Sequence, residues 1–155
     1  LSFQCNNLIF RLQNGELPTN LNPKVWWLLI GTNDLGADNC SVESIVAGNL
    51  AIIKEIQRRR PDSKIVLNSL LPRTQREDGI IDDLWGQIVE INHRLEGFAQ
   101  RMEGVDFFNA TSIFLNDKGD IKLDLLPDRL HPNGKGARRW GKQIAKRVQQ
   151  ILGAR

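Results

Sequence analysis

Apolar residues recur at helical spacing in four stretches of the chain, which are residues 5–16, 41–60, 84–102 and 133–151. In the third stretch they alternate in steps of four and three from Leu84 to Met102, which is the pattern of an amphipathic helix. Asn14-Gly15 and Pro61 stand at the ends of the first two stretches, where helix-terminating residues are expected. The pattern therefore predicts four helices.

Three shorter apolar runs have the length of strands. They are "KVWWLLI" at residues 24–30, "KIVLNSL" at 64–70 and "VDFF" at 105–108. The first run is apolar throughout after its lysine, as expected of a parallel strand that is covered on both faces. We therefore predict three strands at these positions.

The predicted strands and helices alternate along the chain. Parallel strands cannot be joined by short turns and need a crossover helix, so this order predicts an α/β fold with a parallel sheet between layers of helices. The sequence contains no repeat, low-complexity segment or linker. Residues 1–155 are therefore expected to form a single domain.

The composition is that of a soluble globular protein, with 41% hydrophobic and 25% charged residues. No stretch approaches the roughly 20 apolar residues that cross a bilayer, so no membrane span is expected. The two cysteines, Cys5 and Cys40, are too few for a disulfide framework. This favours a reducing compartment and a cytoplasmic location.

The formal net charge is +3, and the basic residues cluster only at Arg58-Arg59-Arg60 and Arg138-Arg139. Both clusters lie in predicted helices, where cations occupy exposed faces and complement the dipole at the carboxyl end. We interpret them in this way and not as nucleic-acid contacts, so no nucleic-acid partner is expected.

Two motifs could carry chemistry. In "LLIGTNDLG", residues 28–36, Asn33 and Asp34 directly follow the first predicted strand. Ligands of an open parallel sheet bind beyond the carboxyl ends of its strands, so these side chains are candidates for a site. The alternative is turn chemistry, in which the Asn or Asp side chain binds its own backbone.

The second motif is "LLPDRLHPNGKG", residues 125–136, in which Asp128 precedes His131 by three positions and Asn133 can cap the last helix. A carboxylate at this spacing can accept a hydrogen bond from Nδ1, which leaves Nε2 as a general base. The alternatives are a surface histidine in a helix-capping turn and a metal site. The metal site is the weaker alternative, because the sequence offers no further cluster of His or Cys ligands beside these two residues.

"GTND" followed about 95 residues later by "DRLHP" resembles blocks III and V of the SGNH (GDSL-like) hydrolase family. The segments "RLQNGELP" and "NPKVWWLLIGTND" are most similar to its branch of platelet-activating-factor acetylhydrolase catalytic subunits. The resemblance extends over nearly the whole chain from about Asn6. It implies a flavodoxin-like three-layer α/β/α fold and a Ser–His–Asp triad that hydrolyses a small-molecule ester, such as an acetyl ester, without cofactor or metal.

Carried over by position, the resemblance makes His131 the base and Asp128 the acid that orients it. Asn33 becomes an oxyanion donor, with Gly31 as its close-packing partner. A homodimer is left open.

The family's Gly-Asp-Ser nucleophile motif does not occur in this sequence, and the glycine of block II, expected near "LSFQ" at residues 1–4, is missing. We therefore expect an N-terminally truncated domain with the last three of five strands, in which residues 24–30 form an edge strand. The resemblance leaves no nucleophile in this chain, which alone should be inactive. Ser41 fits a helix start, Ser69 fits a strand, and Ser2 falls in the block II region.

Two other functions remain open from the sequence. One is a catalytically inactive SGNH-like interaction module, and the other is a flavodoxin-like ligand-binding domain. His93 lies on the polar side of its predicted helix and is interpreted as a solvated surface residue.

Overall fold

The computed structural model describes residues 4–36 and 39–153 of the chain, and they form two compact units. The first unit holds the chain up to Leu70 together with Glu90–Phe108. The second unit holds Leu71–Val89 together with the chain from Asn109 on. Helix α4 (Asp83–Ala99) begins in the second unit and ends in the first.

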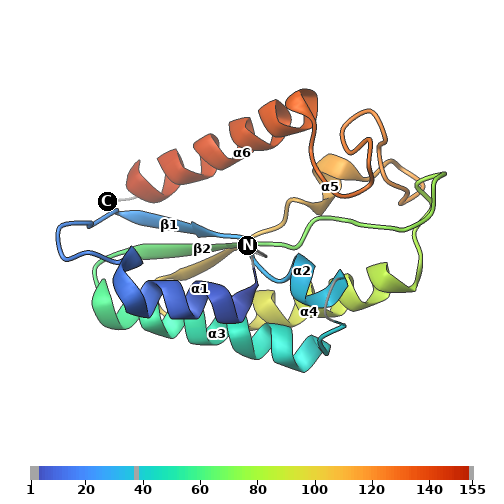
Figure 1. Cartoon of the computed structure of the whole chain (residues 1–155). Coiled ribbons are helices and arrows are strands. Elements are labelled where there is room, and N and C mark those ends of the chain that lie inside the picture. The colour runs from blue at the N-terminus through green and yellow to red at the C-terminus, as the bar shows by residue number, and fades with distance from the viewer. Residues whose placement is uncertain (1–3, 37–38, 154–155) are drawn as a thin grey trace. The chain divides into compact units, whose positions relative to one another are not determined.

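The first unit is built on a parallel sheet whose strands are β1 (Val25–Leu28), β2 (Lys64–Asn68) and β3 (Val105–Phe108), in that order (Figure 1). The predicted α/β fold with a parallel sheet is confirmed. Strand β1 forms one edge of the sheet that the described residues build. Both β1 and β2 end two residues before their apolar runs do. The last residues of these runs, Ile30 and Leu70, bind side chains of α3 and α4.

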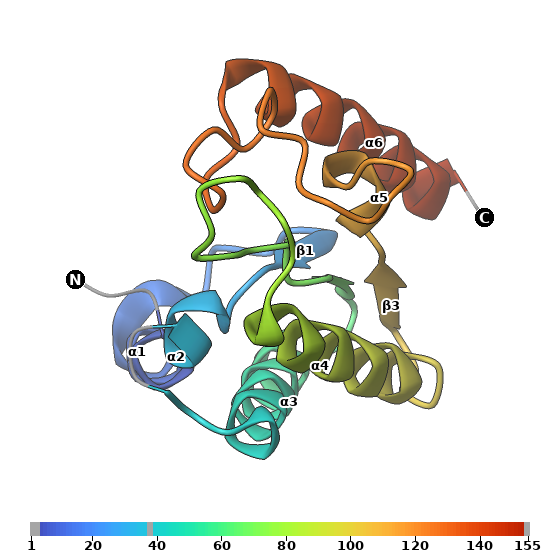
Figure 2. The same ribbon diagram turned by 90° about the vertical axis from the view of Figure 1, so that its right-hand side faces the viewer.

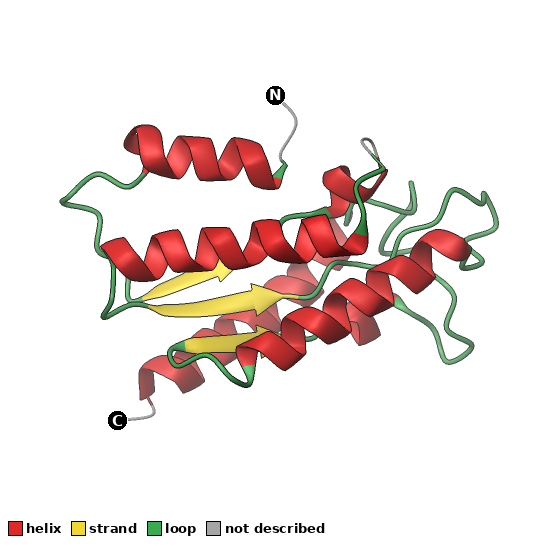
Figure 3. Cartoon of the chain, turned by 90° about the horizontal axis from the view of Figure 1, so that it is seen from below, coloured by secondary structure: helices red, strands yellow, loops and turns green. Residues whose placement is uncertain are grey.

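Helix α3 (Val42–Arg59) and the part of α4 in this unit lie on one face of the sheet (Figures 1 and 3). The buried side of α3 is apolar at helical spacing, with Ile45, Ile52 and Ile56 almost fully enclosed. Ser41 caps α3, since its Oγ accepts a hydrogen bond from the backbone N–H of Ser44 at 3.2 Å. The interpretation of Ser41 as a helix start is therefore confirmed.

Helix α1 (Cys5–Arg11) lies beside α3 and contacts it closely at Gly48 (Figure 3). A Cβ atom at Gly48 would stand only 2.6 Å from the Cβ of the buried Cys5, so no larger residue fits there without a shift. The chain continues into η1 (Leu12–Glu16), where Asn14 and Gly15 leave the helical conformation. The predicted stop signal thus acts where it was expected.

The second unit has its own apolar core of Phe114, Ile121, Leu125 and Leu126. Helix α5 (Thr111–Phe114) and helix α6 (Gly134–Gly153) meet at this core, where the rings of Phe114 and Trp140 lie 6.2 Å apart, edge to face (Figure 2). The predicted last helix is confirmed and begins one residue later than expected.

The sequence pattern missed two short helices, α2 (Thr32–Gly36) and α5. Each has about one turn, which is too short for apolar residues to recur at helical spacing. Of the helices formed by residues 4–36 and 39–153, none combines the length and the apolar character needed to cross a bilayer.

One buried side chain fixes the segment that follows β2. Asn92 of α4 accepts a hydrogen bond from the backbone N–H of Leu70 at 2.7 Å and donates one to its carbonyl oxygen at 3.0 Å. Both residues are buried, so water does not compete for these groups. The amide therefore replaces a neighbouring strand as the partner of this backbone.

We predict that Asn92→Ala destabilises the protein strongly, because it leaves a buried N–H and a buried C=O unpaired. Each such group costs roughly 1–3 kcal/mol, so the free energy of unfolding should fall by about 2–6 kcal/mol. Urea unfolding followed by tryptophan fluorescence measures the change. The matched control is His93→Ala at the exposed neighbouring position, which should change stability by less than about 0.5 kcal/mol. Equal effects of the two substitutions would contradict this role of Asn92.

Candidate active site

The segment after β1 turns sharply at Gly31, whose φ of +121° lies in the region that favours glycine. A Cβ atom at this position would lie 2.7 Å from Cγ2 of Ile45 on α3. The lack of a side chain therefore lets the backbone pass close to α3 and enter α2, which carries Asn33.

Asp34 is a structural residue of this segment. Its carboxylate is buried and accepts hydrogen bonds from the backbone N–H of Cys5, at 3.1 Å to Oδ1 and 3.3 Å to Oδ2. Cys5 is the first residue of α1, where an anion is favoured by the unpaired N–H groups and the helix dipole. The carboxylate thus binds a distant backbone group and not its own turn, while its neighbour Asn33 is half-buried.

A second amide, Asn49 of α3, also holds this segment, and the sequence interpretation missed it. Its Nδ2 donates to the carbonyl oxygen of Ile30 at 3.3 Å and to that of Ile45 at 3.0 Å. The available signal was the position of Asn49 among apolar residues on the buried side of a predicted helix. A polar residue on such a face usually has a buried partner.

In the second unit, the carboxylate of Asp128 organises the turn that presents His131. Its Oδ1 accepts hydrogen bonds from the backbone N–H groups of Leu130 at 3.1 Å and of His131 at 2.7 Å. Its Oδ2 lies 2.7 Å from Nδ1 of the His131 imidazole. One carboxylate therefore fixes both the backbone of the turn and the ring that the turn carries. The hydrogen bond expected from the spacing of these two residues is present.

The turn contains a backbone conformation that is rare for a residue with a side chain. Arg129, between the two residues, has a φ of +62°, in the left-handed region. The hydrogen bonds from the N–H groups of Leu130 and His131 to Asp128 span Arg129 and hold its backbone in this conformation. A turn held in this way presents His131 in one orientation.

The charge on Asp128 is favoured by the same contacts. The backbone N–H of His131, its imidazole and the N–H of Leu130 lower the pKa of the Asp128 carboxyl to about 2. The carboxyl is therefore ionised across the neutral range and can accept a hydrogen bond from the Nδ1–H of His131. This leaves Nε2 of His131 directed away from Asp128, and the side chain of His131 is three-quarters exposed.

The helix that follows anchors the turn from the other end. Oδ1 of Asn133 accepts the backbone N–H groups of Lys135 and Gly136, each at 3.0 Å, so Asn133 caps α6 as predicted. Its Nδ2 also donates to the carbonyl oxygen of Asp124 at 2.9 Å. The turn is thus fixed between the apolar core of this unit and the start of α6.

The four residues expected at the site lie in two places. Gly31 and Asn33 belong to the first unit, and Asp128 and His131 belong to the second, where they are hydrogen-bonded to each other. The resemblance implies that Asn33 and His131 act in one site at the carboxyl end of the sheet, and this stays a prediction. Within residues 4–36 and 39–153, no group of three or more His, Cys, Asp or Glu side chains could hold a metal ion.

Two of the three serines considered as nucleophiles have environments that the structure describes. Ser41 caps α3, and Ser69 is fully buried with its N–H bound to the carbonyl oxygen of Phe108 at 2.9 Å. Ser2 lies outside the described residues, as do the first three residues of the expected block II segment.

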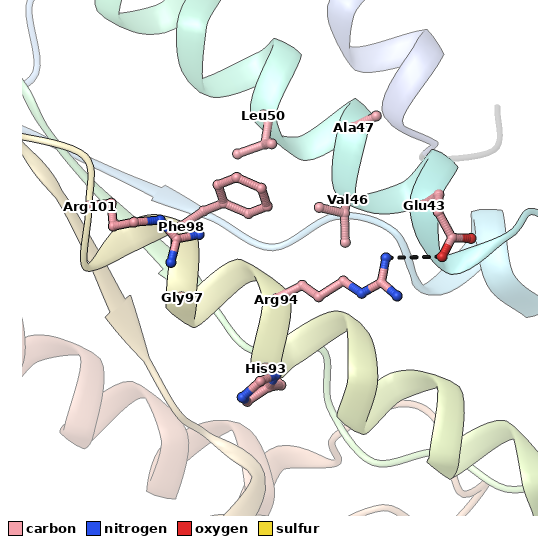
Figure 4. Close-up of a pocket in the computed structure, with 9 residues that line it drawn as sticks. All are labelled: Glu43, Val46, Ala47, Leu50, His93, Arg94, Gly97, Phe98 and Arg101. Carbon is pink, nitrogen blue, oxygen red and sulfur yellow. Dashed lines mark hydrogen bonds and ion pairs between the residues drawn. The ribbon is translucent and has the colours of Figure 1, made fainter.

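His93, the other histidine of the chain, borders a groove of about 530 Å³ between α3 and α4 (Figure 4). Val46 and Phe98 give the groove an apolar floor, and Arg94 reaches across it to Glu43 at 2.9 Å (Figure 4). His93 is exposed, and among the described residues it has no carboxylate partner of the kind that His131 has. The groove therefore lacks the pairing that a catalytic histidine needs.

Comparison with known proteins gives consistent matches. The model of the GDSL-like Lipase/Acylhydrolase family matches residues 5–139. Platelet-activating factor acetylhydrolase IB subunit alpha2 from Gallus gallus is 27% identical over 146 residues, which cover 94% of this chain and 60% of that protein. The Homo sapiens subunit of the same name is 28% identical with the same coverage. The chain thus spans about three-fifths of the length of these curated relatives.

A solved structure of a GDSL-like lipase from Bacteroides thetaiotaomicron matches with a TM-score of 0.78 and 20% identity. The match covers 96% of this chain and 72% of that one. The fold of the chain is therefore that of a GDSL-like lipase.

We predict that Asp128 titrates well below an ordinary aspartate. Its folded pKa of about 2 lies below the value of about 3.9 in an unfolded chain. The stabilisation of the turn is therefore complete above the unfolded pKa and is lost as the pH falls through about 2. Carboxyl carbon chemical shifts measured by NMR against pH report this titration. In a His131→Ala variant the backbone N–H groups remain, so the pKa should rise only part of the way. An ordinary pKa in the native chain would contradict the hydrogen-bonded turn.

Proposed function

The chain belongs to the GDSL-like lipase/acylhydrolase family, and from this premise we propose that it supplies the acid–base part of a serine ester hydrolase. The family consists of ester hydrolases. The observation that carries the proposal is the 2.7 Å hydrogen bond between Oδ2 of Asp128 and Nδ1 of His131. This is the relation that orients the histidine of a Ser–His–Asp triad.

In the proposed mechanism, Nε2 of His131 takes the proton of the attacking serine hydroxyl as its oxygen bonds to the ester carbonyl carbon. The imidazolium that forms is stabilised by Asp128, whose low pKa keeps the carboxylate ionised. His131 then gives the proton to the departing alcohol. It next takes a proton from the water that hydrolyses the acyl-enzyme and returns it to the serine.

We assign the stabilisation of the tetrahedral oxyanion to Asn33, whose side-chain amide can donate a hydrogen bond to it. Gly31 would hold the segment close enough to α3 to set the position of α2. Its tight approach to Ile45 and the anchoring of the segment by Asn49 support this assignment. A donor held by packing needs little reorganisation during the reaction.

We further propose that the nucleophilic serine is not among these 155 residues and that the chain is the later part of a longer catalytic domain. Three observations support this. The sequence has no Gly-Asp-Ser, the chain covers 60% of its relatives, and β1 stands at an edge of the sheet. The competing function is an inactive interaction module, which the missing motif also favours.

For the substrate we propose a small-molecule ester with a short acyl group such as acetyl, hydrolysed without a cofactor. The curated relatives are named as acetylhydrolases, and their similarity covers almost the whole chain.

The first test compares the chain with an extended form. The 155-residue chain should hydrolyse p-nitrophenyl acetate only slowly, because a triad without its nucleophile retains little activity. What remains is the modest effect of substrate binding and of an oxyanion donor. The same chain joined to the upstream residues of its own transcript should be active. Brisk turnover by the short chain would overturn the proposal if substitution of Ser2, Ser41 or Ser69 abolished it. An inactive extended chain would favour the interaction module.

The second test uses variants of the active, extended chain. His131→Ala should lower kcat by roughly 10⁴-fold or more, because the serine loses its base. Asn33→Ala should lower kcat by about 10²- to 10³-fold, the range for one oxyanion donor. His93→Ala is the matched control and should be nearly silent. Equal losses at His93 and His131 would show that His131 is not the base.

A further inference from the structure

Helix α6 concentrates positive charge. It contains six basic residues and no acidic residue, namely Lys135, Arg138, Arg139, Lys142, Lys146 and Arg147. The whole chain has 21 basic and 18 acidic residues, so the chain outside α6 carries 15 basic residues against 18 acidic ones. The net positive charge of the protein therefore comes from this one helix.

Most of these cations lie on one side of the helix. Lys135, Arg139, Lys142 and Lys146 follow one another at steps of four, three and four, which places them in a narrow line at 100° per residue. Arg138 borders this line. We call these five residues the cationic stripe. All five are exposed, and the line from Lys135 to Lys146 is about 16 Å long at the rise of an α-helix.

The stripe points away from the core of its own unit. Trp140 lies on the opposite side of α6 and packs edge to face against Phe114, while Ile144, Val148 and Ile151 on the same side are half-buried. Figure 2 shows α6 and α5 side by side in this unit. Because the apolar side is engaged, contact through the stripe leaves the packing of α6 unchanged.

Few carboxylates neutralise the stripe. Lys135 forms an ion pair with Asp124 at 2.5 Å, and Asp124 also interacts electrostatically with Arg139. The residues Arg138, Arg139, Lys142 and Lys146 form no ion pair within the part of the chain that the structure describes. Four cations thus remain available to an external anion.

We propose that the cationic stripe binds the surface of an anionic lipid bilayer. A group of four to eight Lys and Arg on one helix face is the arrangement that anionic headgroups attract. A straight, exposed line of positive charges fits a flat anionic surface. The rest of the chain has a net negative charge and is repelled from that surface, so the stripe is the side that faces it. A nucleic acid fits less well, because the one aromatic residue of α6 is turned into the core and offers no stacking surface.

Binding of this kind is peripheral and electrostatic. The apolar side of α6 stays packed, so no side chain needs to enter the hydrocarbon. Its strength should fall with salt, because charges at a surface are screened over about 8 Å at physiological ionic strength and about 3 Å at 1 M. The proposal concerns binding alone and does not depend on whether the chain hydrolyses esters.

The test is flotation of the full chain with phosphatidylcholine vesicles, with and without phosphatidylserine. Flotation separates vesicle-bound protein from aggregates, which sink. We expect binding only to the vesicles with phosphatidylserine, and loss of that binding at about 1 M salt. Binding to both vesicle types, or to neither, would overturn the proposal. So would strong binding to duplex DNA without binding to the anionic vesicles.

The variant Arg139→Gln/Lys142→Gln/Lys146→Gln tests the stripe itself. Each cation near an anionic surface contributes about fivefold to the partition coefficient, so the triple variant should bind about 100-fold more weakly. Glutamine is a good helix former, and circular dichroism should show an unchanged helix content. The matched control removes three exposed lysines elsewhere, Lys24→Gln/Lys54→Gln/Lys118→Gln, and changes the net charge equally. An equal loss of binding in the control would show that net charge and not the stripe is responsible.

Discussion

Buried backbone N–H and C=O groups just past the end of a strand need hydrogen-bond partners even though the sheet no longer supplies them. This constraint determines how the first unit is built. Past the end of β1, Asn49 binds the carbonyl oxygen of Ile30, and past the end of β2, Asn92 binds both polar groups of Leu70. These amides come from α3 and α4, the helices that cross over between the strands. The helices therefore cover the sheet and also supply hydrogen-bond partners for backbone groups beyond the ends of its strands.

The same kind of contact shapes both parts of the proposed site. The carboxylate of Asp34 binds the first N–H of α1 and so ties the helix that carries Asn33 to a distant part of the chain. The carboxylate of Asp128 binds two N–H groups of its own turn and also the ring of His131. In each case a carboxylate that binds backbone N–H groups fixes the position of a residue with a proposed role in the reaction. Residues without a direct part in the reaction thus set its geometry.

The sequence predicted the long elements well because burial of one helix face or of a whole strand leaves a periodic pattern. It also predicted the hydrogen bond between Asp128 and His131, since three residues of chain bring the two groups together whatever surrounds them. It missed α2 and α5, which are too short to show a period. It also missed Asn49 and Asn92, because a single polar residue among apolar ones gives no sign of its distant partner. That Asn33 and His131 share one site is a prediction of the resemblance and not of the local pattern, because contacts between distant segments depend on long-range packing.

The contact between Cys5 and Gly48 has a consequence for the redox chemistry of the chain. Burial raises the pKa of the Cys5 thiol to about 12, and the nearby charge of Asp34 acts in the same direction. Oxidants and alkylating reagents attack the thiolate, which is almost absent from Cys5 at neutral pH. The other thiol, Cys40, is free and half-buried, so it reacts first. A covalent label can therefore be attached at Cys40 while the packing of α1 on α3 stays intact.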